Sequence, residues 1–159
     1  MRPWNAIGNG ARADMSLSDA TLERFKSLFN AARPDLETLM AECYSETVVF
    51  RDPLVERRGR EALSRYLNDA YARVTRCGFD FGSTARCPDH LTLPWTMTLE
   101  HRRLARGAPI IVDGITLLQT DAETGLISYH RDYYDAGQLI YENVPLIGGL
   151  VRYMRRQAS

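Results

Sequence analysis

The segment "GLISYHRDYYDAG", residues 125–137, places side chains that can hold or transfer protons directly after an apolar, strand-like run. Successive residues of a strand point to opposite sides of the sheet. This alternation puts His130, Asp132 and Tyr134 on one face and the intervening residues on the other. A carboxyl group in an apolar interior is shifted toward its neutral form, which suits a general acid or base. We therefore predict that this face lines the interior and that Asp132 and His130 hold or deliver a proton.

A second candidate carboxylate lies in "VVFRDPLVERRGREAL", residues 48–63, where Asp52 follows an apolar run and precedes Pro53. Proline cannot donate a hydrogen bond to a neighbouring strand, so the strand should end here. Aspartate before proline often caps a turn through its own side chain. The residue types therefore allow two interpretations of Asp52, a turn cap or a catalytic base.

Candidate pocket residues come from two long segments with period-two alternation, "LTLPWTMTLEHRRL" and "IIVDGITLLQT". Small-molecule sites are mostly apolar with a few polar groups, and one phase of these segments has that composition. The residues predicted to bind a ligand are Trp95, Met97, Val112, Thr116 and His101 from these segments, together with Tyr134 from residues 125–137. The same residues could instead fill the core, and an enclosed cavity that reaches both Asp52 and Asp132 would favour chemistry.

A metal site is not predicted. His101, His130, Asp52 and Asp132 are suitable ligand types, but the sequence shows no ligand spacing such as His-x-x-x-His. We expect no metal and no cofactor.

Composition narrows the class of protein. The chain has 159 residues, 45% of them apolar and 25% charged, which fits one globular domain. No apolar run approaches the roughly 18 residues of a membrane span. Twenty basic and twenty acidic residues give no net positive field for nucleic acid.

Three cysteines without metal-ligand spacing indicate reduced thiols, and the first residues lack the apolar core of a signal peptide. We therefore expect a cytoplasmic protein that binds no nucleic acid and has no membrane span.

Hydrophobic periodicity predicts an α+β domain, in which helices cover one face of a curved antiparallel sheet. The expected helices are 19–32, 34–43 and 59–74, with short C-terminal helices at 136–144 and 148–157. The expected strands are 47–50, 77–81, 91–104, 110–120 and 126–134. Residues 1–16 are predicted to be a flexible tail before a domain of residues 17–159.

This order of elements, with "VVFRDPLVERRGREAL" and "ISYHRDYYD" in place, resembles the nuclear-transport-factor-2-like cone fold, and more narrowly its SnoaL-like branch. That fold implies a cone-shaped sheet around three helices. The resemblance to ketosteroid isomerases places their proton-abstracting aspartate on Asp52. The resemblance to limonene-epoxide hydrolases places their acid on Asp132. The isomerase's oxyanion-hole residues fall near Phe25 and Thr116, so the resemblance does not fix the reaction.

Two functions follow from this resemblance. One is a cofactor-independent isomerase, cyclase or epoxide-hydrolase-like enzyme that uses general acid/base chemistry on a small, largely apolar organic ligand. The other is a non-catalytic ligand-binding or association module of the same fold. In both cases we expect a homodimer through the outer face of the sheet, because that face carries Thr92, Thr96, Thr98, Ile111, Ile115 and Leu117.

Overall fold

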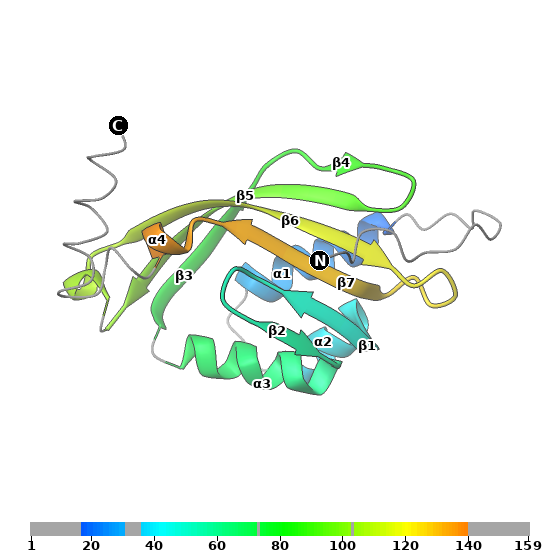
Figure 1. The fold of residues 1–159 in the computed structure, drawn as a ribbon, viewed down its shortest axis with the longest axis horizontal. Helices are drawn as coiled ribbons and strands as arrows, with labels where there is room; N and C mark the ends of the chain where they lie inside the picture. The colour runs from blue at the N-terminus through cyan, green and yellow to red at the C-terminus, as the bar shows by residue number, and fades with distance from the viewer. Residues whose placement is uncertain (1–16, 31–35, 73, 103, 140–159) are drawn as a thin grey trace.

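The computed structural model of the chain describes residues 17–30, 36–72, 74–102 and 104–139, and shows four α-helices and a seven-stranded curved sheet (Figure 1). The helices are α1 (Asp19–Asn30), α2 (Leu36–Cys43), α3 (Arg60–Tyr71) and α4 (Ala136–Leu139), with a short 3₁₀ turn at Ala105–Gly107. The strands are β1 (Tyr44–Arg51), β2 (Glu56–Arg58), β3 (Val74–Phe81), β4 (Ala85–Arg86), β5 (Leu91–His101), β6 (Ile110–Thr120) and β7 (Ile127–Tyr134). The predicted α+β class is confirmed.

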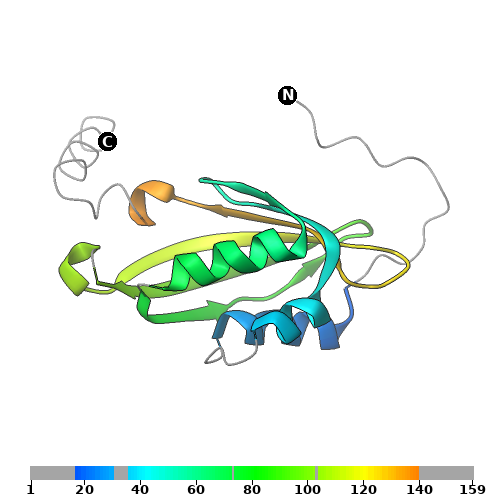
Figure 2. The same cartoon turned by 90° about the horizontal axis from the view of Figure 1, so that it is seen from below.

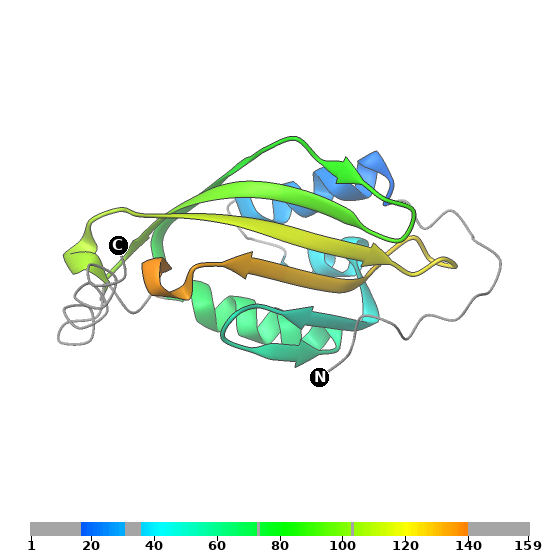
Figure 3. The ribbon, with the colours of Figure 1, turned by 45° about the horizontal axis from the view of Figure 1, so that its top comes forward.

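The sheet runs in the order β2-β1-β7-β6-β5-β3, and β4 pairs with β5 outside this path (Figure 3). The neighbours β5, β6 and β7 are antiparallel, as the turns between them predict. β1 and β7 pair in parallel, which brings the end of β1 beside residues 129–131 of β7. This pairing sets Phe50 opposite His130 and Arg51 opposite Arg131.

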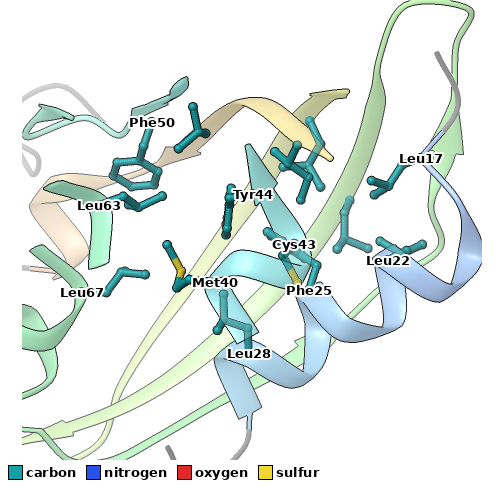
Figure 4. Packing of buried hydrophobic residues seen from close by; sticks show 14 of the residues in the cluster. Leu17, Leu22, Phe25, Leu28, Met40, Cys43, Tyr44, Phe50, Leu63 and Leu67 are labelled. Atoms are coloured by element: carbon teal, nitrogen blue, oxygen red, sulfur yellow. The ribbon is translucent and has the colours of Figure 1, made fainter. Parts of the chain in front are cut away.

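The helices α1, α2 and α3 pack on one face of the sheet (Figure 2). Ser18 begins α1 as predicted, because its hydroxyl accepts the Thr21 backbone N–H at 3.1 Å. At the start of α3, Gly59 has φ of +86°, a left-handed conformation that favours glycine. The helices and sheet enclose a continuous apolar core that includes Leu22, Phe25, Leu28, Met40, Tyr44, Phe50, Leu63 and Leu67 (Figure 4).

Two predicted strands have different ends in the structure, and two short strands are added to the sheet. β1 begins at Tyr44 rather than residue 47, and β5 ends at His101 rather than 104. The strands β2 and β4 were not expected from sequence, because segments of three and two residues are too short to show an alternation. Backbone pairing with β1 and β5 defines these two strands.

A register shift lies between the pairs Gln119–Tyr129 and Thr120–Ile127 of β6 and β7. An extra residue in one strand reverses the alternation, so the side chains after it point to the opposite faces of the sheet from those that the alternation before it predicts. This irregularity precedes His130, so the alternation continues undisturbed from His130 to Tyr134. Asp132 lies opposite Thr116, and Tyr134 lies opposite Gly114.

No helix among the described residues is long and apolar enough to cross a membrane. The predicted tail at 1–16 and most of the predicted C-terminal helices, beyond Leu139, lie outside the described residues. The division into a tail and a domain therefore stays a prediction.

Candidate active site

A cavity of about 120 Å³, here named the inner pocket, lies between the helices and the sheet. Aromatic side chains dominate its lining, and two carboxylates reach it, Asp52 from the turn after β1 and Asp132 from β7. The lining residues are Phe25, Phe29, Phe50, Asp52, Tyr66, Leu67, Ala70, Tyr71, Phe79, Phe81, Trp95, Met97, Thr116, His130, Asp132, Tyr134 and Leu139. The predicted interior face of β7, with His130, Asp132 and Tyr134, is confirmed, whereas Tyr133 is 45% exposed.

Asp132 receives two hydrogen bonds on one of its oxygens, Oδ1. The Thr116 hydroxyl donates to it at 2.5 Å, and Nε2 of His130 lies 2.9 Å from it. The Thr116 oxygen in turn accepts the Trp95 indole N–H at 2.8 Å. Within the part of the chain that the structure describes, the other oxygen, Oδ2, has no hydrogen-bond partner. One oxygen thus fixes the carboxylate in place, and the other is available to a ligand.

The tautomer of His130 follows from its two neighbours. The ring is 1% exposed, and its Nδ1 lies 2.8 Å from the Tyr44 hydroxyl. An ionised carboxylate only accepts hydrogen bonds, so Nε2 carries the proton that points to Asp132. In the neutral ring Nδ1 then accepts from Tyr44. Both ring nitrogens of His130 are therefore engaged, one by Tyr44 and the other by Asp132.

Asp52 is the turn cap that the sequence allowed, and its side chain also lines the inner pocket. Its Oδ1 accepts the backbone N–H groups of Leu54 and Val55, both at 2.7 Å, which is the turn cap. Its Oδ2 accepts the Tyr66 hydroxyl at 2.8 Å and, more weakly, the Tyr134 hydroxyl at 3.4 Å. Four donors surround this carboxylate, so its charge is well satisfied and its position is fixed.

The two tyrosines beside Asp52 stay protonated. Burial, followed by the hydrogen bond and charge of Asp52, raises the pKa of Tyr66 well above its ordinary value. The pKa of Tyr134 is raised for the same first reason, with Asp52, Tyr66 and Asp132 adding to the effect. Each hydroxyl is thus a neutral donor at the pocket wall.

The position of the Trp95 ring depends on a glycine that sequence reasoning missed. Trp95 of β5 is paired with Gly114 of β6, and a Cβ at Gly114 would lie 2.3 Å from the indole ring. The bare backbone therefore leaves the space in which the ring reaches Thr116. A glycine within an otherwise regular strand pattern is the signal that could have indicated this close approach.

A second cavity of about 230 Å³, here named the outer pocket, adjoins the inner one. Six residues line both cavities, namely Tyr66, Ala70, Tyr71, Met97, Tyr134 and Leu139. Its remaining lining is almost entirely apolar, with His101 as the exception. The two cavities together give a polar end at Asp132 and an apolar end at the outer pocket.

The structure brings together most of the predicted site residues and separates two of them. Asp52, Asp132, His130, Tyr134, Trp95, Met97 and Thr116 all line the inner pocket. His101 lines the outer pocket. Val112 is fully buried in the core beside Trp95 and is absent from the described lining of both pockets. Val112 pairs with Met97 across the sheet, and directly paired residues share a face, so it packs beside the pocket wall.

Sequence reasoning missed two tyrosines of the site, Tyr66 beside Asp52 and Tyr44 beside His130. Tyr66 lies on the apolar stripe of α3, where a buried hydroxyl needs a partner, and that need was a usable signal. Tyr44 stood at the boundary of a helix and a strand, with no pattern pointing to His130. It is fully buried, and its ring stacks on that of His130 with 5.9 Å between ring centroids.

These features define an α+β cone with an aromatic, carboxylate-bearing pocket of small-molecule size. The family model described as "SnoaL-like domain" matches residues 22–130, which is well over half of the chain. The chain belongs to the SnoaL-like domain family, as its sequence resemblance predicted. The match ends at His130, so it does not extend to Asp132. No curated protein matches the chain in sequence.

Solved structures agree on the fold. A protein of Catenulispora acidiphila with a ketosteroid isomerase-like fold, in complex with trimethylamine, is 18% identical with a TM-score of 0.68, over 80% of this chain and 95% of that one. An NTF2-like protein of unknown function from Exiguobacterium is 21% identical with a TM-score of 0.62, over 73% and 98%. A candidate SnoaL-like polyketide cyclase of Shewanella denitrificans is 16% identical with a TM-score of 0.62, over 77% and 95%.

Proposed function

We propose that the inner pocket binds a small, largely apolar organic molecule and that Asp132 removes or returns a proton on it. The observation that carries this proposal is the asymmetry of the Asp132 carboxylate. Thr116 and His130 hold Oδ1, while Oδ2 has no partner among the described residues. A base must be held rigidly and still present a free lone pair, and this carboxylate meets both needs.

His130 and Tyr44 orient this base. The hydrogen-bonded chain from Tyr44 through His130 to Asp132 fixes the plane of the carboxylate and stabilises its charge. When Asp132 takes a proton, that stabilisation is lost, which favours return of the proton to the ligand. A base that is regenerated in this way suits an isomerisation or a cyclisation, in which a proton leaves one atom and returns to another.

The opposite wall supplies neutral donors. The hydroxyls of Tyr66 and Tyr134 already donate to Asp52, and a ligand oxygen that enters beside them can compete for these protons. Asp52 thus acts mainly through the tyrosines that it positions. Among the proteins of similar fold, one is a candidate polyketide cyclase and another holds trimethylamine, and both support a small organic ligand.

A hydrogen-exchange assay tests the base without knowledge of the natural substrate. Cyclopentanone and cyclohexanone are incubated with the protein in D₂O, and NMR follows deuterium entry beside the carbonyl. The protein should accelerate exchange over buffer, since a positioned base contributes about 10²-fold or more. Asp132→Asn should abolish the acceleration while the fold, followed by circular dichroism, is retained.

The matched control is Asp135→Asn, three residues along the same segment. Asp135 caps the start of α4, since its Oδ1 accepts the Gly137 backbone N–H at 2.7 Å, and asparagine keeps that acceptor. This variant should exchange protons at the unchanged rate. Loss of exchange in Asp135→Asn but not in Asp132→Asn would refute the assignment.

A second candidate function is a ligand-binding or association module of the same fold without turnover. Exposed apolar residues on the outer face of the sheet favour it, because Ile111 is 63% and Ile115 38% exposed. We propose that this face forms a homodimer in either case. Ligand binding without any acceleration of exchange would favour the module over the enzyme.

A further inference from the structure

The described lining of the inner pocket has an unbalanced charge. It contains the carboxylates of Asp52 and Asp132 and no lysine or arginine. The other titratable groups that face the cavity are His130 and the hydroxyls of Tyr66, Tyr71 and Tyr134. Within this described lining, an anionic ligand would meet two carboxylates and no lysine or arginine to offset them.

Each of these carboxylates accepts several hydrogen bonds. Four groups donate to Asp52, namely the backbone N–H groups of Leu54 and Val55 and two tyrosine hydroxyls. The Thr116 hydroxyl and the His130 ring donate to Asp132. Their charges help to keep Tyr134 protonated, after burial itself, so the field within the pocket is negative.

Most of the remaining wall is aromatic, and several of its rings meet at steep angles. Phe79 and Trp95 have centroids 5.4 Å apart with an interplanar angle of 73°, and Trp95 and Tyr134 have centroids 6.1 Å apart at 53°. Phe25 and Phe29 add two more rings from α1, 5.0 Å apart. Aromatic faces carry negative potential and attract organic cations, most strongly where water is excluded.

The size of the cavity limits which ligand groups can fit in it. At about 120 Å³ it is slightly smaller than the engineered cavities of roughly 150 Å³ that hold benzene. A metal ion is disfavoured as the occupant, because no three histidine, cysteine or acidic residues cluster in the part of the chain that the structure describes. Aromatic rings also offer no ligand atoms to a metal.

We infer that the ligand group held in the inner pocket is a small organic cation, an amine or quaternary ammonium whose charge is offset by Asp132 and Asp52. The inference rests on the proposed function and specifies the ligand of the same site. The methyl or methylene groups around the nitrogen contact the rings, and any longer apolar substituent extends into the outer pocket.

Three probes of nearly equal shape separate charge from size: tetramethylammonium, tert-butanol and pivalate. Titrations of ¹⁵N-labelled full-length protein are followed at the Trp95 indole N–H signal, which lies at the pocket wall. A Trp4→Phe background leaves Trp95 as the single indole, since the chain has two tryptophans. Tetramethylammonium should bind about tenfold or more tightly than tert-butanol, and pivalate should not shift the signal.

Variants of the two aspartates test which carboxylate binds the charge of tetramethylammonium. Asp132→Asn and Asp52→Asn should each weaken tetramethylammonium binding by about tenfold and leave tert-butanol binding unchanged. Asp135→Asn, outside the pocket, should bind all three probes like the parent protein. Melting by circular dichroism checks that each variant is folded.

The alternative outcomes separate this inference from the proposed function. If tert-butanol or pivalate binds as tightly as tetramethylammonium, the cation inference is wrong and the pocket proposal stands. If the aspartate variants bind tetramethylammonium unchanged, the charge is not recognised at these residues and the inference is again wrong. If no probe moves the Trp95 signal, the inner pocket does not take ligands of this size and both proposals fall.

Discussion

The two acidic residues of the site have different environments although both carry several hydrogen bonds. Asp52 is held on both oxygens, by backbone groups on one side and tyrosine hydroxyls on the other. Asp132 is held on one oxygen only. A fully satisfied carboxylate is a structural anchor, whereas one with a free oxygen can meet a ligand. This difference in satisfaction is the reason why we propose a positioning role for Asp52 and proton transfer for Asp132.

Protonated groups in the interior predict a loss of stability in alkali. Burial raises the pKa of the Cys43 thiol from 9.0 to about 11, and it also raises the pKa values of Tyr44, Tyr66 and Tyr134. A pKa raised on folding contributes stability that is complete below the unfolded value and is lost as pH rises through the folded value. The free energy of unfolding in urea should thus be steady to about pH 9 and fall between 9.0 and about 11.

Cysteine variants assign part of this loss. Cys43→Ala should lower stability at all pH values and flatten the decline above pH 9, because the buried thiol no longer titrates. Cys87→Ala, which removes an exposed thiol, should leave the decline as it is. A free energy of unfolding that stays constant into strong alkali would contradict the assignment of these buried, protonated groups.

At the scale of elements, strand β6 determines the shape of the pocket through one missing side chain. Gly114 lies opposite Trp95 on β5 and opposite Tyr134 on β7, so it sits between two rings of the lining. Those rings tilt toward each other across it, with centroids 6.1 Å apart. The bare backbone of β6 at Gly114 thus leaves the space that the ring of Trp95 occupies.

Gly114→Ala tests this role of β6. The new Cβ would lie 2.3 Å from the Trp95 ring, so the indole must move and its hydrogen bond to Thr116 should break. We expect a loss of about 1–3 kcal/mol in unfolding free energy, typical of overpacking, and a shifted Trp95 indole N–H signal.

The matched control is Gly78→Ala on β3, where a Cβ would meet nothing within 4 Å. Restricting the unfolded chain there should change stability by no more than about 1 kcal/mol. Equal losses at the two glycines would show that strand flexibility, and not the Trp95 contact, sets the cost.

At the scale of the whole molecule, the outer face of the sheet is more apolar than a solvent-exposed sheet usually is. Ile115 of β6 pairs directly with Tyr133 of β7, and Ile111 lies two alternations along the same strand. All three are exposed, at 38%, 45% and 63% respectively. The Arg131 guanidinium covers part of the Tyr133 ring at 4.8 Å. An apolar patch with a polar margin is typical of a protein–protein interface.

We predict a homodimer through this outer face, with a dimer mass by light scattering at micromolar concentration. Ile111→Glu or Ile115→Glu should shift the protein to monomer, because a two-fold interface places each new charge in the contact twice. Leu54→Glu, a comparable substitution of a residue that is 38% exposed but lies outside this face, should leave the mass unchanged. A monomer mass for the parent protein would overturn the prediction.

The sequence by itself determined the class of fold and the direction in which the side chains of residues 130–134 point. Helical and period-two spacing are local properties, so the helices, the long strands and the shared face of His130, Asp132 and Tyr134 could be read directly. The Asp-Pro turn could also be read, because a side chain that caps its own backbone needs no distant partner. The family resemblance added the cone and the two candidate carboxylates.

Only the tertiary structure decided which groups complete the site. Tyr44 reaches His130 across 86 residues of chain, through the parallel pairing of β1 with β7. The Tyr66 hydroxyl reaches Asp52 only because α3 packs over the end of β1. Val112, which alternation grouped with the pocket, is fully buried in the core beside it. Periodicity gives the direction of a side chain relative to its own strand. The curvature of the sheet and the packing of helices on it decide whether that direction leads to a cavity, a core or a partner.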